Sequence, residues 1–193
     1  MRNPICPLAF PLLLLLANAP AVAQADRAAR LGQLQNDILS AASATEFLTQ
    51  RCAGLHLVDP VVVKAEQVPN APGTATADIR ALLKVSDAEP LRYRRVQLKC
   101  GPLALSVADN WYVPARLTPA MNDRLDHSDT SFGTVVKPLD FHRRTVTMAT
   151  PKGGDAIGPQ TVFQLEAVLL TPDETPFSLV IENYQAVLLQ NPR

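Results

Sequence analysis

The fold is decided by three stretches of sequence: RYRRVQLKCG (92–101), ADNWYVPARL (108–117) and LDHSDTSFG (125–133). The first two predict the strands of an antiparallel hairpin, Arg92–Cys100 and Leu105–Val113, joined by a tight turn at Gly101-Pro102. Between the second and third stretches, Thr118 and Pro119 stand at the cap and first position of a short helix. We expect Gly133 to open a further strand through residues 135 and 136.

Arg95 carries a charge on a segment that otherwise has the composition of a protein core, so it needs a partner. Its planar guanidinium suits a carboxylate, because two parallel hydrogen bonds fix both position and orientation. The alternative is a structural arginine that pairs with an acidic neighbour or extends to the surface. Arg92 and Arg94 differ from Arg95 in strand parity or lie nearer the strand start, and we expect both to be solvated.

The rest of the chain supplies helices first and strands afterwards. Leucine and isoleucine at helical spacing predict an amphipathic helix over 28–42, and Ser43 and Glu46 form a capping box for the next one. Strands are predicted at 61–68, 143–149, 161–170 and 177–189. Because the strands and helices do not alternate, the fold class is α+β, with a mainly antiparallel sheet and two to three helices covering one face.

The N-terminus has the features of a signal peptide. Arg2 precedes an apolar run at 8–16 that is too short to span a bilayer, and two overlapping A-x-A cleavage sites end at residues 23 and 25. We therefore expect a signal peptide at 1–25, one domain at 26–193, a periplasmic or secreted location and no stable membrane anchor after cleavage. Equal numbers of acidic and basic residues, 18 each, argue against nucleic-acid binding.

Two cysteines remain in the predicted mature chain, Cys52 and Cys100. In an oxidising compartment an even number of cysteines indicates a disulfide. Two separate buried thiols are the alternative, and the sequence leaves both interpretations open. Neither a C-x-x-C motif nor a Cys/His cluster with metal-ligand spacing occurs in the chain.

Five segments, in order along the chain, resemble chorismate pyruvate-lyase and its fold relatives, the UTRA ligand-binding domains. Ser43–Thr45 is similar to the helix-start motif of this family, and Arg95–Cys100 to its arginine-bearing strand. Ala108–Pro114 follows as the next strand, and Ser131–Gly133 as a turn of a small residue, an apolar residue and glycine. Pro176–Glu182 is similar to the final strand, which ends in a functional glutamate. The resemblance covers most of the predicted mature chain.

The resemblance implies a ligand cavity enclosed between an antiparallel sheet and its helices. It also implies a reaction in which chorismate loses pyruvate and leaves 4-hydroxybenzoate, without any metal or redox cofactor. In that scheme Arg95 holds the ring carboxylate, and Glu182 contacts the hydroxyl or ether oxygen across the ring. Backbone groups near Ala44 and Phe132 approach the substrate. For Glu182 the alternative is an ion pair with an arginine and no substrate at all.

Two functions from different classes follow. One is a lyase that acts on chorismate or a related enolpyruvyl ether. The other is a non-catalytic module, like the UTRA domains, that binds a small aromatic or carboxylate ligand as a monomer. Export argues against the lyase, because chorismate is made and used in the cytoplasm, and Asn110 stands where a lyase tends to place a basic residue. Both functions need an arginine that faces a cavity, so the sequence leaves both open, together with an exported scaffold that has no ligand.

Overall fold

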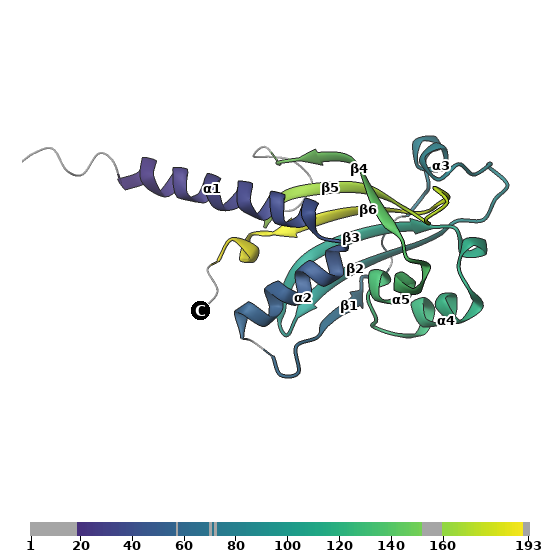
Figure 1. The fold of residues 1–193 in the computed structure, drawn as a ribbon, viewed down its shortest axis with the longest axis horizontal. Coiled ribbons are helices and arrows are strands. Elements are labelled where there is room, and N and C mark those ends of the chain that lie inside the picture. Colours follow the sequence, from purple (N-terminus) through teal and green to yellow (C-terminus); the bar gives the residue numbers. More distant parts are fainter. Residues whose placement is uncertain (1–18, 57, 70, 72, 152–159, 191–193) are drawn as a thin grey trace, which may run out of the picture.

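Six antiparallel strands form one sheet in the order β1-β2-β3-β6-β5-β4 (Figure 1). The computed structural model describes residues 19–56, 58–69, 71, 73–151 and 160–190. The strands are β1 (Val63–Gln67), β2 (Arg92–Cys100), β3 (Leu103–Tyr112), β4 (His142–Ala149), β5 (Thr161–Leu170) and β6 (Pro176–Gln185).

Five α-helices accompany the sheet in the described ranges: α1 (Ala19–Ser40), α2 (Ala44–Leu55), α3 (Ala77–Leu83), α4 (Pro119–His127) and α5 (Phe132–Val136). Polar caps start three of them. Ser43 Oγ accepts a hydrogen bond from the Glu46 amide at 3.1 Å, as the capping-box pattern predicts. Thr76 and Thr118 cap α3 and α4 in the same way.

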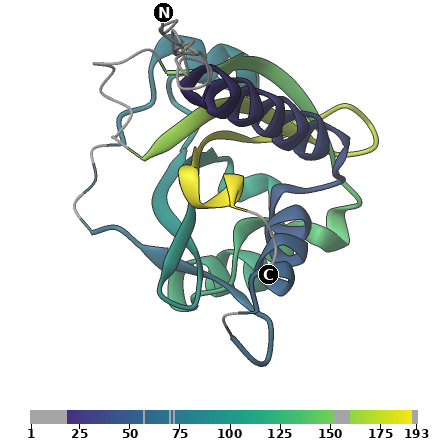
Figure 2. The ribbon, with the colours of Figure 1, turned by 90° about the vertical axis from the view of Figure 1, so that its left-hand side faces the viewer.

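In the described ranges, α1, α2, α4 and α5 cover one face of the sheet, and α3 packs on the other. Leu34 and Ile38 of α1 share a core cluster with Phe47 and Leu48 of α2. Figure 2 shows the short helix η3 (Ala186–Leu189) beside α1, and its Leu188 belongs to the same cluster. The helices α4 and α5 form a second cluster on this face, whereas α3 packs against strand residues of opposite parity. The predicted α+β class is confirmed.

The segment after Gly133 is a helix, so the expected strand through residues 135 and 136 is wrong. The Val135 amide donates to the Ser131 carbonyl at 3.1 Å, which closes the first turn of α5. Val135 and Val136 are both buried against α4 and the sheet. Packing decides here against the strand preference of β-branched residues, which is weak by comparison.

A disulfide joins α2 to the sheet. Cys52 lies in α2 and Cys100 at the end of β2, with their Cα atoms 5.6 Å apart and both side chains fully buried. The bond fixes the helix whose first residues lie beside the cavity described below.

The N-terminal half of α1 projects beyond the end of the sheet (Figure 1). Residues 22–29 are exposed, and burial begins with the turn that contains Leu31 and Leu34. The predicted signal-peptide boundary at residue 25 lies inside this helix, and residues 1–18 lie outside the described part. None of the helices described has both the length and the apolar character needed to cross a membrane.

Candidate ligand-binding site

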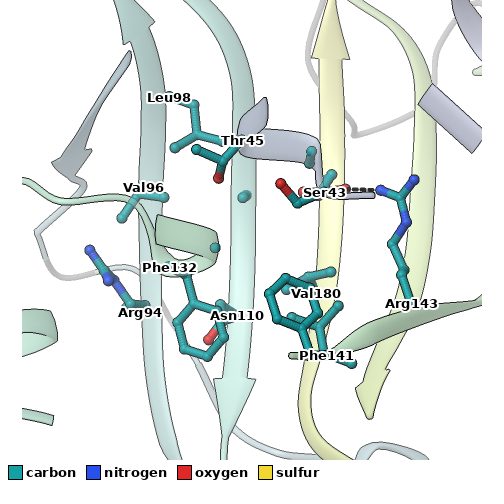
Figure 3. Close-up of a pocket in the computed structure, with 15 residues that line it drawn as sticks. Ser43, Thr45, Arg94, Val96, Leu98, Asn110, Phe132, Phe141, Arg143 and Val180 are labelled. Atoms are coloured by element: carbon teal, nitrogen blue, oxygen red, sulfur yellow. Dashed lines mark ion pairs between the residues drawn. The ribbon is translucent and has the colours of Figure 1, made fainter. Parts of the chain in front are cut away.

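A cavity lies between the helix-covered face of the sheet and the starts of α2 and α5 (Figure 3). The centres of water molecules can reach about 50 Å³ of this cavity, so it has room for about three to five waters. Fifteen residues line it: Ser43, Ala44, Thr45, Arg94, Val96, Leu98, Ala108, Asn110, Phe132, Gly133, Phe141, Arg143, Leu169, Val180 and Glu182.

The period of two along each strand brings the polar residues of this cavity together. On β2, Arg94, Val96 and Leu98 point to the helix-covered side. The register of β3 places Asn110 directly opposite Arg94, and the register of β6 places Glu182 beside Ala108. Side chains that are distant in sequence therefore line the same side of the cavity.

Arg94 is a buried cation that has no hydrogen-bond partner among the described residues. Arg94 is only 7% exposed, and none of its three guanidinium nitrogens makes a hydrogen bond to the described part of the chain. Burial lowers the pKa of Arg94, and the nearby Tyr112 and Asp126 only oppose this shift. A buried guanidinium in this condition is costly unless something supplies an acceptor.

Arg95, the arginine that we expected to face a ligand, points to the opposite side of the sheet. Its Nη1 lies 3.7 Å from Asp109 Oδ1, and that carboxylate also accepts a hydrogen bond from the Tyr93 hydroxyl at 2.5 Å. Arg95 matches the structural alternative, and the expectation that Arg94 is solvated is wrong. The cause is strand parity: Arg94, and not Arg95, shares a face with Val96 and Leu98.

Glu182 does face the cavity, as predicted, and it pairs with Arg143 of β4. Its Oε2 lies 3.7 Å from Arg143 Nη1 and accepts a hydrogen bond from the Tyr184 hydroxyl at 2.7 Å. Burial raises the pKa of Glu182, while Arg143 and Tyr184 act in the opposite direction. Burial likewise raises the pKa of Tyr184, so its hydroxyl keeps its proton.

Ala44 and Phe132 line the cavity as well, at the first residues of α2 and α5. The Phe132 ring contacts Tyr112 and Phe177, with centroid separations of 5.4 and 6.4 Å. The next residue, Gly133, lies so close to α2 that a Cβ there would be 2.8 Å from Thr45 Oγ1. The two helix starts therefore meet at the wall of the cavity.

Three polar residues of the site were not predicted: Arg94, Asn110 and Arg143. Arg94 alternates with Val96 and Leu98 along β2, and this pattern could have predicted that it faces the core. Asn110 donates from Nδ2 to Ser178 Oγ at 2.9 Å, and its Oδ1 has no partner among the described residues. The sequence does not indicate that Arg143 faces the cavity, because β4 has no alternating apolar pattern around it and its other residues are exposed.

Solved structures of PhnF and of its effector domain have a similar architecture. The structure of PhnF from Mycobacterium smegmatis matches with a TM-score of 0.55 and 19% identity, over 79% of this chain and 67% of that one. The effector domain of PhnF alone matches with a TM-score of 0.50 and 16% identity, over 65% and 82% of the two chains. The protein thus has the UTRA-like fold.

At the level of sequence, the chain is 40% identical over 182 residues to the uncharacterized protein y4mC of Sinorhizobium fredii (strain NBRC 101917 / NGR234). The match covers 84% of this chain and 76% of that protein. The chain therefore belongs to the y4mC family. No family model matches it.

Proposed function

We propose that this protein is an exported binding module for a small ligand that carries one anionic group, with an aromatic carboxylate as the preferred class. The observation that carries the proposal is the buried guanidinium of Arg94, which lines the cavity and makes no hydrogen bond to the described residues. A ligand carboxylate would accept the hydrogen bonds that the chain itself does not provide.

The charges around the cavity favour one anionic group rather than two. The lining contains two arginines and one carboxylate, and Arg143 already has Glu182 at 3.7 Å. Arg94 is then the remaining positive charge in the lining, and one negative charge on the ligand would balance it. Figure 3 shows Arg94 and Arg143 on opposite sides of the cavity, so the uncompensated charge lies at one end.

Most of the remaining wall is apolar and suits a ring, although Ser43, Thr45 and Asn110 also line it. Val96, Leu98, Leu169 and Val180 come from the strands, and Phe132 contributes an aromatic face. Since the present space holds only a few waters, a ring enters when the half-buried Phe132 or Phe141 turns aside. An apolar body with one charged group is the usual composition of a small-molecule site.

Export is part of the proposal. The apolar run at 8–16 with its A-x-A sites is typical of a secretory signal, and the Cys52–Cys100 disulfide suits an oxidising compartment. A periplasmic or secreted location favours binding over the lyase reaction, because chorismate is a cytoplasmic metabolite.

The lyase is kept as a second candidate because of Glu182. A buried carboxyl with a raised pKa is able to give a proton to an ether oxygen, which the loss of pyruvate from chorismate requires. The two candidates differ in one measurable respect, since only the lyase releases 4-hydroxybenzoate from chorismate.

Isothermal titration of the full chain with benzoate and with 4-hydroxybenzoate tests the proposal. We expect saturable binding that Arg94→Met weakens by about 100-fold, because removing one partner of a buried charge pair costs about 3 kcal/mol. Arg95→Met is the matched control and should bind like the wild type, since Arg95 lies on the other face.

Three outcomes decide between the functions. Release of 4-hydroxybenzoate from chorismate would replace the binding module with the lyase. Absence of binding to either acid would contradict the proposed ligand class. Equal losses in Arg94→Met and Arg95→Met would show that the cavity arginine is not the anion-binding residue.

A further inference from the structure

Arg143 is in contact with two separate parts of the molecule at once. Its Nη2 donates to the backbone carbonyl of Ile38 in α1, and its Nη1 lies 3.7 Å from Glu182 Oε2 in the cavity. We infer that Arg143 is a positioning residue that couples the charge state and occupancy of the cavity to the anchoring of the C-terminal end of α1. The ligand part of this inference rests on the proposed function, whereas the link itself does not need a ligand.

At the α1 end, Arg143 supplies a donor where the helix lacks one. The last carbonyls of an α-helix have no partner within it, and a cation is favourable there. Within the described part of the chain, the Ile38 carbonyl otherwise accepts only a long hydrogen bond, 3.4 Å, from the Ala41 amide. Ile38 is fully buried and Leu34 nearly so, while residues 22–29 are exposed. The C-terminal half of α1 therefore holds the helix on the body.

At the cavity end, the charge of Glu182 keeps Arg143 inside. The two side chains are only 6% and 7% exposed, and Arg143 Nη1 makes no hydrogen bond within the described part of the protein. Glu182 is the carboxylate that lines the cavity beside Arg143, so neutralising it would remove the counter-charge that holds the guanidinium there. Arg143 would then move toward solvent along the exposed edge strand β4 and release the Ile38 carbonyl.

Occupation of the cavity acts in the other direction. An oxygen of the ligand near Arg143 gives the free Nη1 an acceptor and holds the guanidinium more firmly. The connection from α1 to the cavity is also short, because only residues 41–43 separate α1 from α2, and Ser43 and Ala44 both line the cavity. Holding the Arg143 guanidinium more firmly therefore anchors the C-terminal end of α1 more firmly.

Amide hydrogen exchange of the full chain, followed by mass spectrometry, measures this coupling without a ligand. In Arg143→Met we expect peptides that cover residues 34–40 to exchange about 10-fold faster. Glu182→Gln should accelerate the same peptides, although Glu182 does not touch α1, and it should add nothing in the double variant with Arg143→Met. Arg143→Lys keeps the charge and should restore part of the protection.

Arg144→Met is the matched control, since Arg144 is the next residue of the same strand and is exposed. It should leave exchange in α1 within about twofold of the wild type. The inference is overturned if Glu182→Gln leaves α1 unchanged, or if its effect is the same with and without Arg143. A loss of protection across all strands in Arg143→Met would indicate general destabilisation instead, and would equally overturn it.

A second arm adds saturating 4-hydroxybenzoate, with titration calorimetry on the same samples. Binding together with slower exchange at residues 34–40, absent in Arg143→Met, supports coupling to the ligand. Binding without any change in α1 contradicts the coupling and leaves the proposed function intact. Absence of binding contradicts the proposed function, and the ligand-free variants then decide the Arg143 link alone.

Discussion

Replacing Arg94 by methionine should stabilise the free protein while it removes ligand binding. Methionine keeps the apolar stem of the side chain and removes only the charged group. All three guanidinium nitrogens of Arg94 lack hydrogen bonds within the described structure, and the residue is 7% exposed. Folding of the wild type therefore transfers an unpartnered cation into an apolar cavity.

The size of the effect follows from the cost of that transfer. An uncompensated buried charge costs several kcal/mol, and replacing buried ionic groups by apolar ones of similar volume stabilises proteins by about 1–4 kcal/mol. Because Asp126 partly offsets the burial of Arg94, we expect a gain of about 2 kcal/mol. For a chain of this length, such a gain raises Tm by about 4–8 °C.

Urea denaturation followed by circular dichroism, without added ligand, measures this gain. Arg95→Met is the control, because Arg95 is 37% exposed and its ion pair with Asp109 spans 3.7 Å. Partly exposed pairs of this kind contribute at most about 1 kcal/mol, so this variant should lie near the wild type or slightly below it. A clear loss of stability in Arg94→Met would refute the reasoning, because it would mean that the guanidinium has a partner inside the protein.

Three further predictions concern the frame of the cavity. Removing the Cys52–Cys100 disulfide by a double change to alanine should lower the free energy of unfolding by about 4 kcal/mol, given the sequence separation of 48, and urea denaturation measures it. Gly133→Ala should cost about 1–3 kcal/mol, because its Cβ would lie 2.8 Å from Thr45 Oγ1, and Thr45→Ala in the same chain should recover part of the loss of Tm. The raised pKa of Glu182 means that the folded state binds a proton more tightly than the unfolded state. Stability should therefore fall as pH rises from about 4.5 through that higher pKa, and Glu182→Gln should flatten this slope in denaturation series from pH 4 to 8.

The sequence predicted the strands and the capped helix starts well, because local chemistry decides them. The strand predicted at 161–170 matches β5, and the capping box at Ser43 begins α2. The error after Gly133 has a different origin. Two β-branched residues there are buried against α4 and the sheet, and a helix satisfies that packing better than a strand. Contacts of this kind are formed by residues distant in sequence, so no local pattern reveals them.

The site was predicted one residue away from its true position on β2. Glu182 was predicted because Pro176–Glu182 resembles the final strand of the lyase and UTRA fold, which ends in a functional glutamate. Arg95 was chosen over Arg94, although the apolar residues Val96 and Leu98 share the parity of Arg94. Because side chains alternate between the two faces, a shift of one residue moves a charge from the cavity to the open face. The role of Arg143 could not be predicted from the sequence, since only the tertiary structure places this residue of β4 at the cavity.

If the proposed function is right, the two arginines of the cavity show how stability and ligand binding oppose each other in this protein. Arg143 has a carboxylate partner and a backbone carbonyl, so the protein satisfies it internally. Arg94 has neither among the described residues, and a chain selected for stability alone would lose such a residue. In the proposed function, an anionic ligand supplies the acceptor that Arg94 lacks. The free-energy cost of burying Arg94 would then contribute to the affinity for an anion, because the anion would supply hydrogen bonds that the described residues do not.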